Sequence, residues 1–290
     1  MYIWIQENPR FRIQENHRLG FGQPPVALSG PSRIPSLLRS ETQPRGLTFY
    51  VDIDLRIGRE VKPITGIFCP DRYRLNSKID LIVYLHGHND KAKCFEDRGV
   101  VPIDQYWKCR PFWLREEVNY SGKNIILVAP TLGQRSEAGN LVIGNGFDDY
   151  LEQVRAALIT YGPYKKVQPP PMLGNVILAS HSGGGSPMLN IASSGNRTVA
   201  NIQQYWGFDC LYGEKDEWIK WAKSKSNKDK WLFIYYKNST KTESRRLETD
   251  AIKQRLFNVL VSESEACNHC LIPITHFKDR LQKAPFLSNR

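Results

Sequence analysis

Residues 175–185 read NVILASHSGGG, a short apolar run that leads directly into a glycine-rich turn. The run from Asn175 to Ala179 shows no polar alternation, which is typical of a strand covered on both faces in a parallel sheet. Ser180 and Gly184 stand two positions before and after Ser182. A sharp strand-to-helix turn that exposes a serine nucleophile needs small residues at these two positions. The segment therefore predicts a buried strand followed by a turn that presents Ser182.

The same turn fits a second interpretation, because a glycine run before a helix can also bind phosphate. No Gly-Lys-Ser/Thr sequence follows Gly183–Gly185, so the Walker pattern is absent. Ser180 also replaces the glycine that usually opens a nucleophile turn. If Ser182 is a nucleophile, the sequence must also supply a general base, an acid and a second oxyanion donor.

Similar short apolar runs recur along the chain and alternate with segments long enough for helices. The clearest predicted helix covers Phe147–Thr160, and another carries Leu247, Ile252, Leu256 and Val259. Predicted strands cover 47–57, 64–69, 79–85, 124–129, 175–179, 202–208, 231–236 and 270–274. This alternation predicts an α/β fold with a predominantly parallel central sheet flanked by helices.

Residues 1–45 differ from the rest because they are rich in proline, glycine and arginine and show no sustained period. This composition indicates an irregular N-terminal arm, followed by one domain over residues 46–290. No apolar run approaches the roughly 18 residues that span a bilayer. Glu7 and Arg10 precede any apolar region, so no secretory signal is visible, and a cytoplasmic location is expected.

A second donor to an oxyanion is predicted after the strand at 79–85, where the sequence continues His86-Gly87-His88. A serine nucleophile needs two preorganised donors for the oxyanion that it forms. The N–H of Gly183, next to Ser182, is one candidate, and the N–H of His88 is the other. His86 is expected to stabilise the loop. An ordinary turn explains a His-Gly pair equally well when it is considered alone.

His276 is the predicted general base, because it follows the predicted last strand at 270–274 and a loop there would lie beside Ser182. A structural histidine is the alternative. Asp209 is the predicted acid, because it stands at the end of the strand at 202–208. Glu243, Glu248 and Asp250 are its rivals. The order Ser182, Asp209, His276 matches the chain order of α/β-hydrolase triads.

From Leu47 onward the chain resembles the α/β-hydrolase superfamily through YLHGH (84–88), VAPTLG (128–133), ASHSGGG (179–185), GFDCLYG (207–213) and THF (275–277). The resemblance implies acyl transfer to water, by an esterase, lipase or peptidase, without a metal or organic cofactor. In that superfamily the acid usually follows one strand later than Asp209, although some lipase-like members place it here.

Lys and Arg outnumber Asp and Glu by 40 to 29, which gives a formal charge of +11. This excess favours anionic partners and a small-molecule or peptide substrate that carries negative charge. No zinc-finger or RRM-type motif accompanies it, so the sequence carries no strong nucleic-acid signal. A catalytically silent hydrolase-fold module that binds an anionic partner is the alternative function.

Two residues are candidates for substrate contact, and two cysteines have the spacing of zinc ligands. Trp107 belongs to an aromatic group after the HGH loop that fits either an acyl pocket or the core, and Arg135 could hold a substrate carboxylate or phosphate. Cys267 and Cys270 have CxxC spacing, but no second ligand pair follows, so free thiols are expected.

Overall fold

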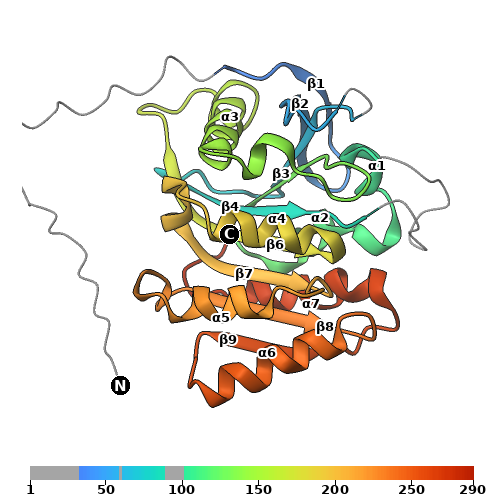
Figure 1. Ribbon diagram of the computed structural model, residues 1–290. Helices are drawn as coiled ribbons and strands as arrows, with labels where there is room; N and C mark the ends of the chain where they lie inside the picture. The colour runs from blue at the N-terminus through green and yellow to red at the C-terminus, as the bar shows by residue number, and fades with distance from the viewer. Residues whose placement is uncertain (1–32, 59–60, 89–100) are drawn as a thin grey trace, which may run out of the picture. The chain divides into compact units, whose positions relative to one another are not determined.

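The computed structural model describes residues 33–58, 61–88 and 101–290, all of which belong to one unit of the chain. A single nine-stranded sheet runs through it in the order β1-β2-β3-β5-β4-β6-β7-β8-β9. The strands are β1 (Leu37–Glu41), β2 (Gly46–Asp52), β3 (Ile64–Pro70), β4 (Lys78–Leu85), β5 (Ile126–Pro130), β6 (Met172–His181), β7 (Ile202–Phe208), β8 (Trp231–Tyr236) and β9 (Val259–Glu263). Neighbouring strands pair antiparallel from β1 through β2 and β3 to β5. From β5 onward, the strands β5, β4, β6, β7, β8 and β9 run parallel to one another. Figure 1 shows β6, β7, β8 and β9 following one another from the centre of the molecule downward.

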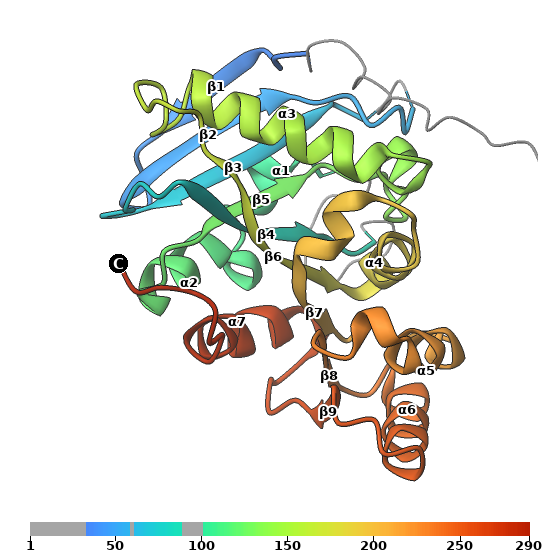
Figure 2. The same ribbon diagram turned by 90° about the vertical axis from the view of Figure 1, so that its left-hand side faces the viewer.

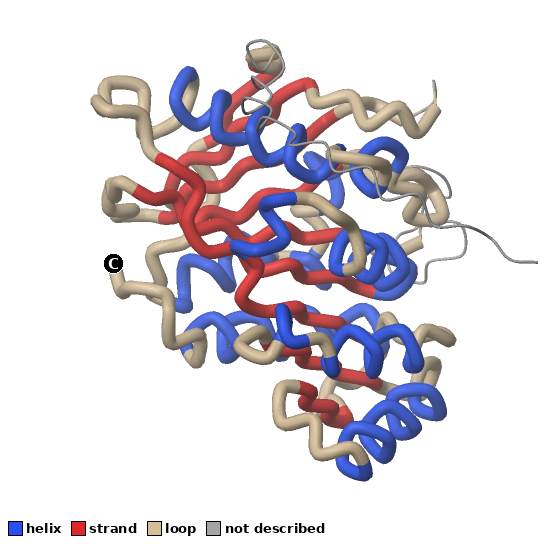
Figure 3. The backbone as a smooth tube through the Cα atoms, turned by 60° about the vertical axis from the view of Figure 1, so that its left-hand side comes forward, coloured by secondary structure: helices blue, strands red, loops and turns tan. Residues whose placement is uncertain are grey.

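Helices cover both faces of this sheet, as the apolar runs of its central strands require. They are α1 (Ile103–Tyr106), α2 (Leu114–Ser121), α3 (Gly146–Thr160), α4 (Gly185–Ala192), α5 (Lys215–Lys223), α6 (Lys241–Lys253) and α7 (Ile272–Gln282). Figure 2 shows α4, α5 and α6 along one face and α2 and α7 along the other. Figure 3 shows the strands as one continuous layer between them. None of the helices in the described ranges has the length and apolar character needed to cross a membrane.

The alternation of side chains along β4 divides the core into two parts. Leu81, Val83 and Leu85 pack into the cluster that also contains the apolar faces of α3, α4, α5 and α6. Ile82 and Tyr84 point the other way and join the cluster formed with α1, α2 and α7. Because successive residues of a strand face opposite sides, one run of apolar residues serves both cores.

The sequence predicted most of this architecture. The α/β class and the parallel centre are confirmed, and the runs at 79–85, 124–129 and 175–179 correspond to β4, β5 and β6. The predicted helix at Phe147–Thr160 is α3.

Two predictions about the ends of the sheet are wrong. Leu37–Glu41 was expected in the irregular arm of residues 1–45 but forms β1, an exposed edge strand. The remainder of that arm up to residue 32 lies outside the described residues. Residues 270–274 do not form a strand, because Ile272 begins α7 with Pro273 in its first turn. The last strand is β9, which ends at Glu263.

A close contact between β3 and the α1 segment provides a test of this packing. A Cβ added at Gly66 would lie 2.6 Å from the buried ring of Trp107. We expect Gly66→Ala to lower the free energy of unfolding by about 1–3 kcal/mol, because the ring has no space to move into. Denaturant unfolding measures this. Gly195→Ala is the control, since nothing lies within 4 Å of a Cβ there. Equal stability of the two variants would contradict this packing.

Candidate active site

Ser182 occupies a sharp turn between β6 and α4. β6 ends at His181, residues Ser182–Gly184 form a short 3-10 helix, and α4 begins at Gly185. Ser182 has a φ of 50°, in the left-handed region that non-glycine residues rarely adopt. The side chain is half-buried, with its hydroxyl 3.3 Å from the hydroxyl of Tyr212. Strand, strained serine and helix together have the form of a nucleophile elbow.

The HGH loop after β4 lies directly against this turn. A Cβ added at Gly87 would be 2.6 Å from the Cβ of Ser182, so only glycine permits this approach. The ring of His88 covers Gly183, where an added Cβ would lie 2.0 Å from the His88 Cδ2. The two segments that carry the predicted oxyanion donors are therefore neighbours. Their role as an oxyanion hole remains a prediction.

His86 links the HGH loop to the loop after β5. Its buried ring accepts the N–H of Leu132 at Nε2, over 2.8 Å, so the proton resides on Nδ1, which lies 2.9 Å from the carbonyl oxygen of Gly87. The hydroxyl of Ser136 donates to the carbonyl of His86. Burial lowers the pKa of His86 to about 4, so the ring is neutral at pH 7. This position excludes His86 as the base and gives it a structural role.

Asp209 follows β7 and is fully buried. Its carboxylate accepts hydrogen bonds from the backbone N–H of Lys237 (2.9 Å) and from the hydroxyls of Ser239 (2.6 Å) and Thr240. Burial alone would raise the pKa of this carboxyl group. The hydrogen bonds, that with His269 first among them in its effect on the pKa, outweigh burial and hold the pKa well below its usual range. Asp209 is therefore ionised at neutral pH.

His269 is the histidine that Asp209 contacts. Its Nδ1 lies 2.6 Å from Oδ2 of Asp209. This contact engages Nδ1, so Nε2 is the ring nitrogen that does not face Asp209. About a third of the His269 side chain is exposed. No hydrogen bond joins His269 to Ser182 in the described part of the chain, where the Ser182 hydroxyl contacts Tyr212 instead.

His181 supports His269 from the side of the sheet. The centroids of the two rings lie 4.4 Å apart with the ring planes tilted by 36°, and Nε2 of His181 lies 3.2 Å from the carbonyl oxygen of His269. Burial lowers the pKa of His181 to about 3, and the neighbouring His269 acts in the same direction. A neutral His181 therefore adds no positive charge beside His269.

The structure does not bring His276, the base predicted from the sequence, to Asp209. Its Nε2 lies 2.7 Å from the hydroxyl of Ser264, and its ring stacks on Tyr235 at 3.9 Å between centroids. The cause is the misplaced last strand. The segment after the true last strand, β9, carries His269, whereas His276 lies within α7.

The rivals of Asp209 lie elsewhere. Glu243 pairs with Arg246 on α6 at 2.6 Å, and Asp250 pairs with Lys215 at 3.0 Å. Glu248, also on α6, makes no hydrogen bond to His269. Asp209 is thus the carboxylate that the structure places on a histidine at this edge of the sheet.

The two predicted substrate contacts differ in their burial. Trp107 is completely buried, with the guanidinium of Arg115 over its ring, which agrees with the alternative interpretation of a core residue. Contact between Trp107 and substrate remains a prediction. Arg135 is exposed on the loop after β5, where its backbone N–H donates to the carboxylate of Glu137. The neighbouring residue, Ser136, contacts His86. Contact between Arg135 and substrate remains a prediction.

The cysteines of the CxxC segment do not form a pair. Cys267 is an exposed free thiol, whereas Cys270 is disulfide-bonded, so the expectation of free thiols is wrong for Cys270. Across the described ranges, no group of three or more His, Cys, Asp or Glu side chains is arranged to hold a metal ion.

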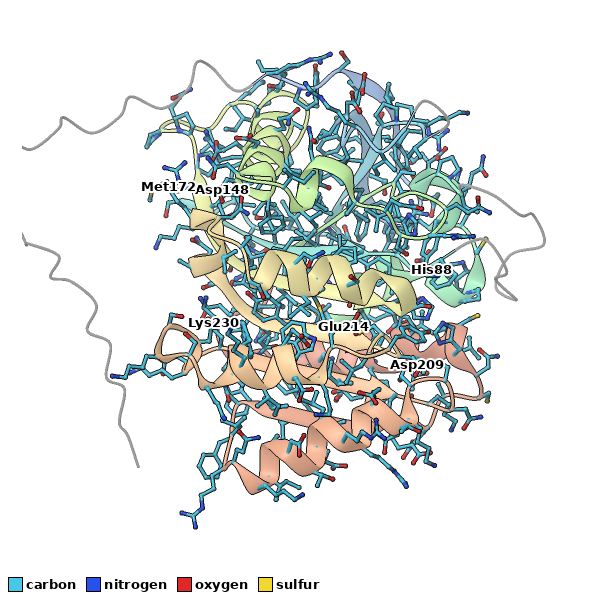
Figure 4. All side chains as sticks on the ribbon, viewed as in Figure 1. His88, Asp148, Met172, Asp209, Glu214 and Lys230 are labelled. Carbon is cyan, nitrogen blue, oxygen red and sulfur yellow. The ribbon has the colours of Figure 1, made fainter. Side chains whose placement is uncertain are left out.

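The site as a whole lies at the carboxyl ends of the parallel strands. Figure 4 shows His88 and Asp209 at the end of the sheet opposite Met172 and Lys230. In the register of the sheet, His181 pairs with Phe208 and Phe208 pairs with Tyr235. Ser182 and Asp209 therefore leave neighbouring strands at the same level.

Comparisons with known proteins agree on the fold. No family model matches the chain, and no curated protein matches its sequence. A mutant of the feruloyl esterase module from Clostridium thermocellum, solved with sinapinate, matches with a TM-score of 0.52 and 12% identity, over 88% of this chain and 95% of that chain. An S-formylglutathione hydrolase from Agrobacterium tumefaciens matches with a TM-score of 0.48 and 11% identity, over 84% and 96%. The sheet order and the serine turn after β6, together with the first of these likenesses, define an α/β-hydrolase fold.

The buried, neutral His86 predicts a pH dependence of stability. Unfolded histidine takes up a proton below about pH 6.5, whereas folded His86 stays neutral down to about pH 4. Stability should therefore fall as the pH decreases through this interval, by roughly 2 kcal/mol between pH 6.5 and 5 for this one group. Because glutamine cannot titrate, the free energy of unfolding of His86→Gln should fall between these pH values by about 2 kcal/mol less than that of the wild type. Denaturant unfolding at both pH values measures the difference. Identical losses would show that His86 is protonated in the folded state.

Proposed function

We propose that this chain is a serine hydrolase that cleaves an ester or amide through an acyl-enzyme, with Ser182 as nucleophile, His269 as base and Asp209 as acid. The observation that carries the proposal is the 2.6 Å contact between His269 and the buried, ionised Asp209. This pair lies at the same sheet edge as the strained turn that presents Ser182.

The proposed mechanism has two acyl-transfer steps. His269 accepts the proton of Ser182 as the serine oxygen attacks the substrate carbonyl, and Asp209 stabilises the imidazolium that forms. The N–H groups of Gly183 and His88 bind the oxyanion. His269 then gives its proton to the leaving group, and water releases the acyl group by the same sequence in reverse. The buried hydrogen bonds on Asp209 keep the acid ionised throughout.

Two features bear on the substrate. The feruloyl esterase module matches this chain with a TM-score of 0.52, and this likeness favours ester over amide cleavage. The formal charge of +11 favours a substrate with negative charge, and the exposed Arg135 is our candidate contact for its carboxylate or phosphate. The contact between Asp209 and His269 supports the hydrolase over the silent binding module, for which we find no separate supporting observation among the described residues.

Labelling with a fluorophosphonate probe tests the nucleophile. The wild type should be labelled, because a base beside Ser182 activates its hydroxyl. Ser182→Ala should not be labelled and should lose ester hydrolysis by several orders of magnitude. Gel fluorescence and mass spectrometry of the modified peptide give the readout. Folded wild-type protein that resists the probe would contradict the proposal.

A matched pair of histidine variants tests the base. His269→Gln should lose labelling and hydrolysis by about 10³-fold or more, because His269 is the proposed acceptor of the serine proton. His276→Gln should retain activity within a few-fold, since His276 contacts Ser264 and Tyr235 instead of Asp209. Steady-state kinetics on one ester measures both variants, and circular dichroism checks their folding. The reverse ranking would restore His276 as the base.

A further inference from the structure

Tyr212 is the side chain that contacts the nucleophile in this structure. Its hydroxyl lies 3.3 Å from the Ser182 hydroxyl, and about half of the Tyr212 surface is exposed. The residue lies three positions after Asp209, in the loop between β7 and α5. An exposed hydroxyl within hydrogen-bond distance of the nucleophile is placed where a substrate must arrive.

The backbone of this loop is held in place. The carboxylate of Glu214 accepts the N–H of Tyr212 at 3.2 Å and the N–H of Gly213 at 3.1 Å. On its other side, the chain is anchored by the buried Asp209. The backbone that carries Tyr212 is therefore held on both sides of the residue.

The sheet order shows on which side of Ser182 this hydroxyl lies. β6, which presents Ser182, has β4 on one side and β7 on the other. The HGH loop, with the proposed oxyanion donor of His88, follows β4. Tyr212 follows β7, on the same side as Asp209 and its partner His269. During acyl transfer the carbonyl oxygen points to the oxyanion donors and the leaving group points toward the base.

We propose that Tyr212 is a further catalytic residue whose hydroxyl donates a hydrogen bond to the leaving-group oxygen of an ester substrate. This inference rests on the proposed function. When the tetrahedral intermediate collapses, the bond between carbon and the leaving oxygen breaks and its electron pair goes to that oxygen. The Nε2–H of His269 supplies the proton. Tyr212 keeps its own proton and stabilises the negative charge that develops before the transfer is complete.

The protonation state of Tyr212 fits this role. Burial of part of the side chain raises the pKa of the phenol, and the hydrogen bond with Ser182 only partly opposes this effect. The hydroxyl is therefore a donor throughout the neutral range. It can leave Ser182 for the substrate when the serine turns toward His269.

The test compares Tyr212→Phe with the wild type on ethyl butyrate and 4-nitrophenyl butyrate, which share an acyl group. We expect kcat/KM for the ethyl ester to fall about tenfold, the usual effect of one lost hydrogen bond. The nitrophenyl ester should lose less than about threefold, because nitrophenolate is a weak base and needs little help to leave. Tyr120→Phe is the matched control, since Tyr120 is 66% exposed on α2 and should change neither rate.

Each other outcome overturns the inference. Equal losses on the two esters would place Tyr212 on the acyl or oxyanion part of the reaction. Unchanged or faster hydrolysis would show that Tyr212 only restrains the resting serine. A wild type that takes the fluorophosphonate label but hydrolyses neither ester would retain the activated serine and exclude this role. Failure of the wild type to take the label would instead remove the proposed function itself.

Discussion

The buried Asp209 carboxylate is the constraint on which the carboxyl edge of the sheet depends. A charge at zero exposure is tolerated only when it is saturated with hydrogen bonds. Here the donors come from two separate segments, the chain after β8, through Lys237, Ser239 and Thr240, and the segment after β9, through His269. One carboxylate therefore joins three consecutive connections of the parallel sheet, and the histidine is positioned by the same bonds that satisfy the acid.

The parallel sheet makes this convergence possible. Adjacent parallel strands end at the same level, so the connections after β6, β7, β8 and β9 lie side by side although they are far apart in sequence. The HGH loop reaches the other side of the serine turn from β4, and Gly87 permits the contact. Asp209, the proposed acid, follows the strand next to the one that carries Ser182, and the hydroxyls of Ser239 and Thr240 after β8 bind its carboxylate.

The sequence predicted the parts of the molecule whose signals are local. The apolar runs of β4, β5 and β6, the small residues around Ser182 and the position of Asp209 could all be identified without long-range information. The histidine could not, because CLIPIT at 270–275 has the composition of a strand, while tertiary contacts make it the start of α7. Asn268 as a cap and Pro273 in the first turn were the available signals of a helix. β1 was missed because its side chains are mostly exposed.

The backbone at the site also affects how far this protein can be stabilised. Ser182 and Asp209 both adopt positive φ values, 50° and 47°, although neither is glycine. Such conformations cost on the order of 1 kcal/mol each, and the rest of the sheet must supply the energy that maintains them. The residues proposed to perform the chemistry are therefore among the least favourable local choices in the chain. At Ser182, glycine would remove this cost together with the hydroxyl, so stability and the proposed activity oppose each other there. At Asp209, glycine would also leave the donors from Lys237, Ser239 and His269 without their acceptor, so the strained backbone is retained for stability as well.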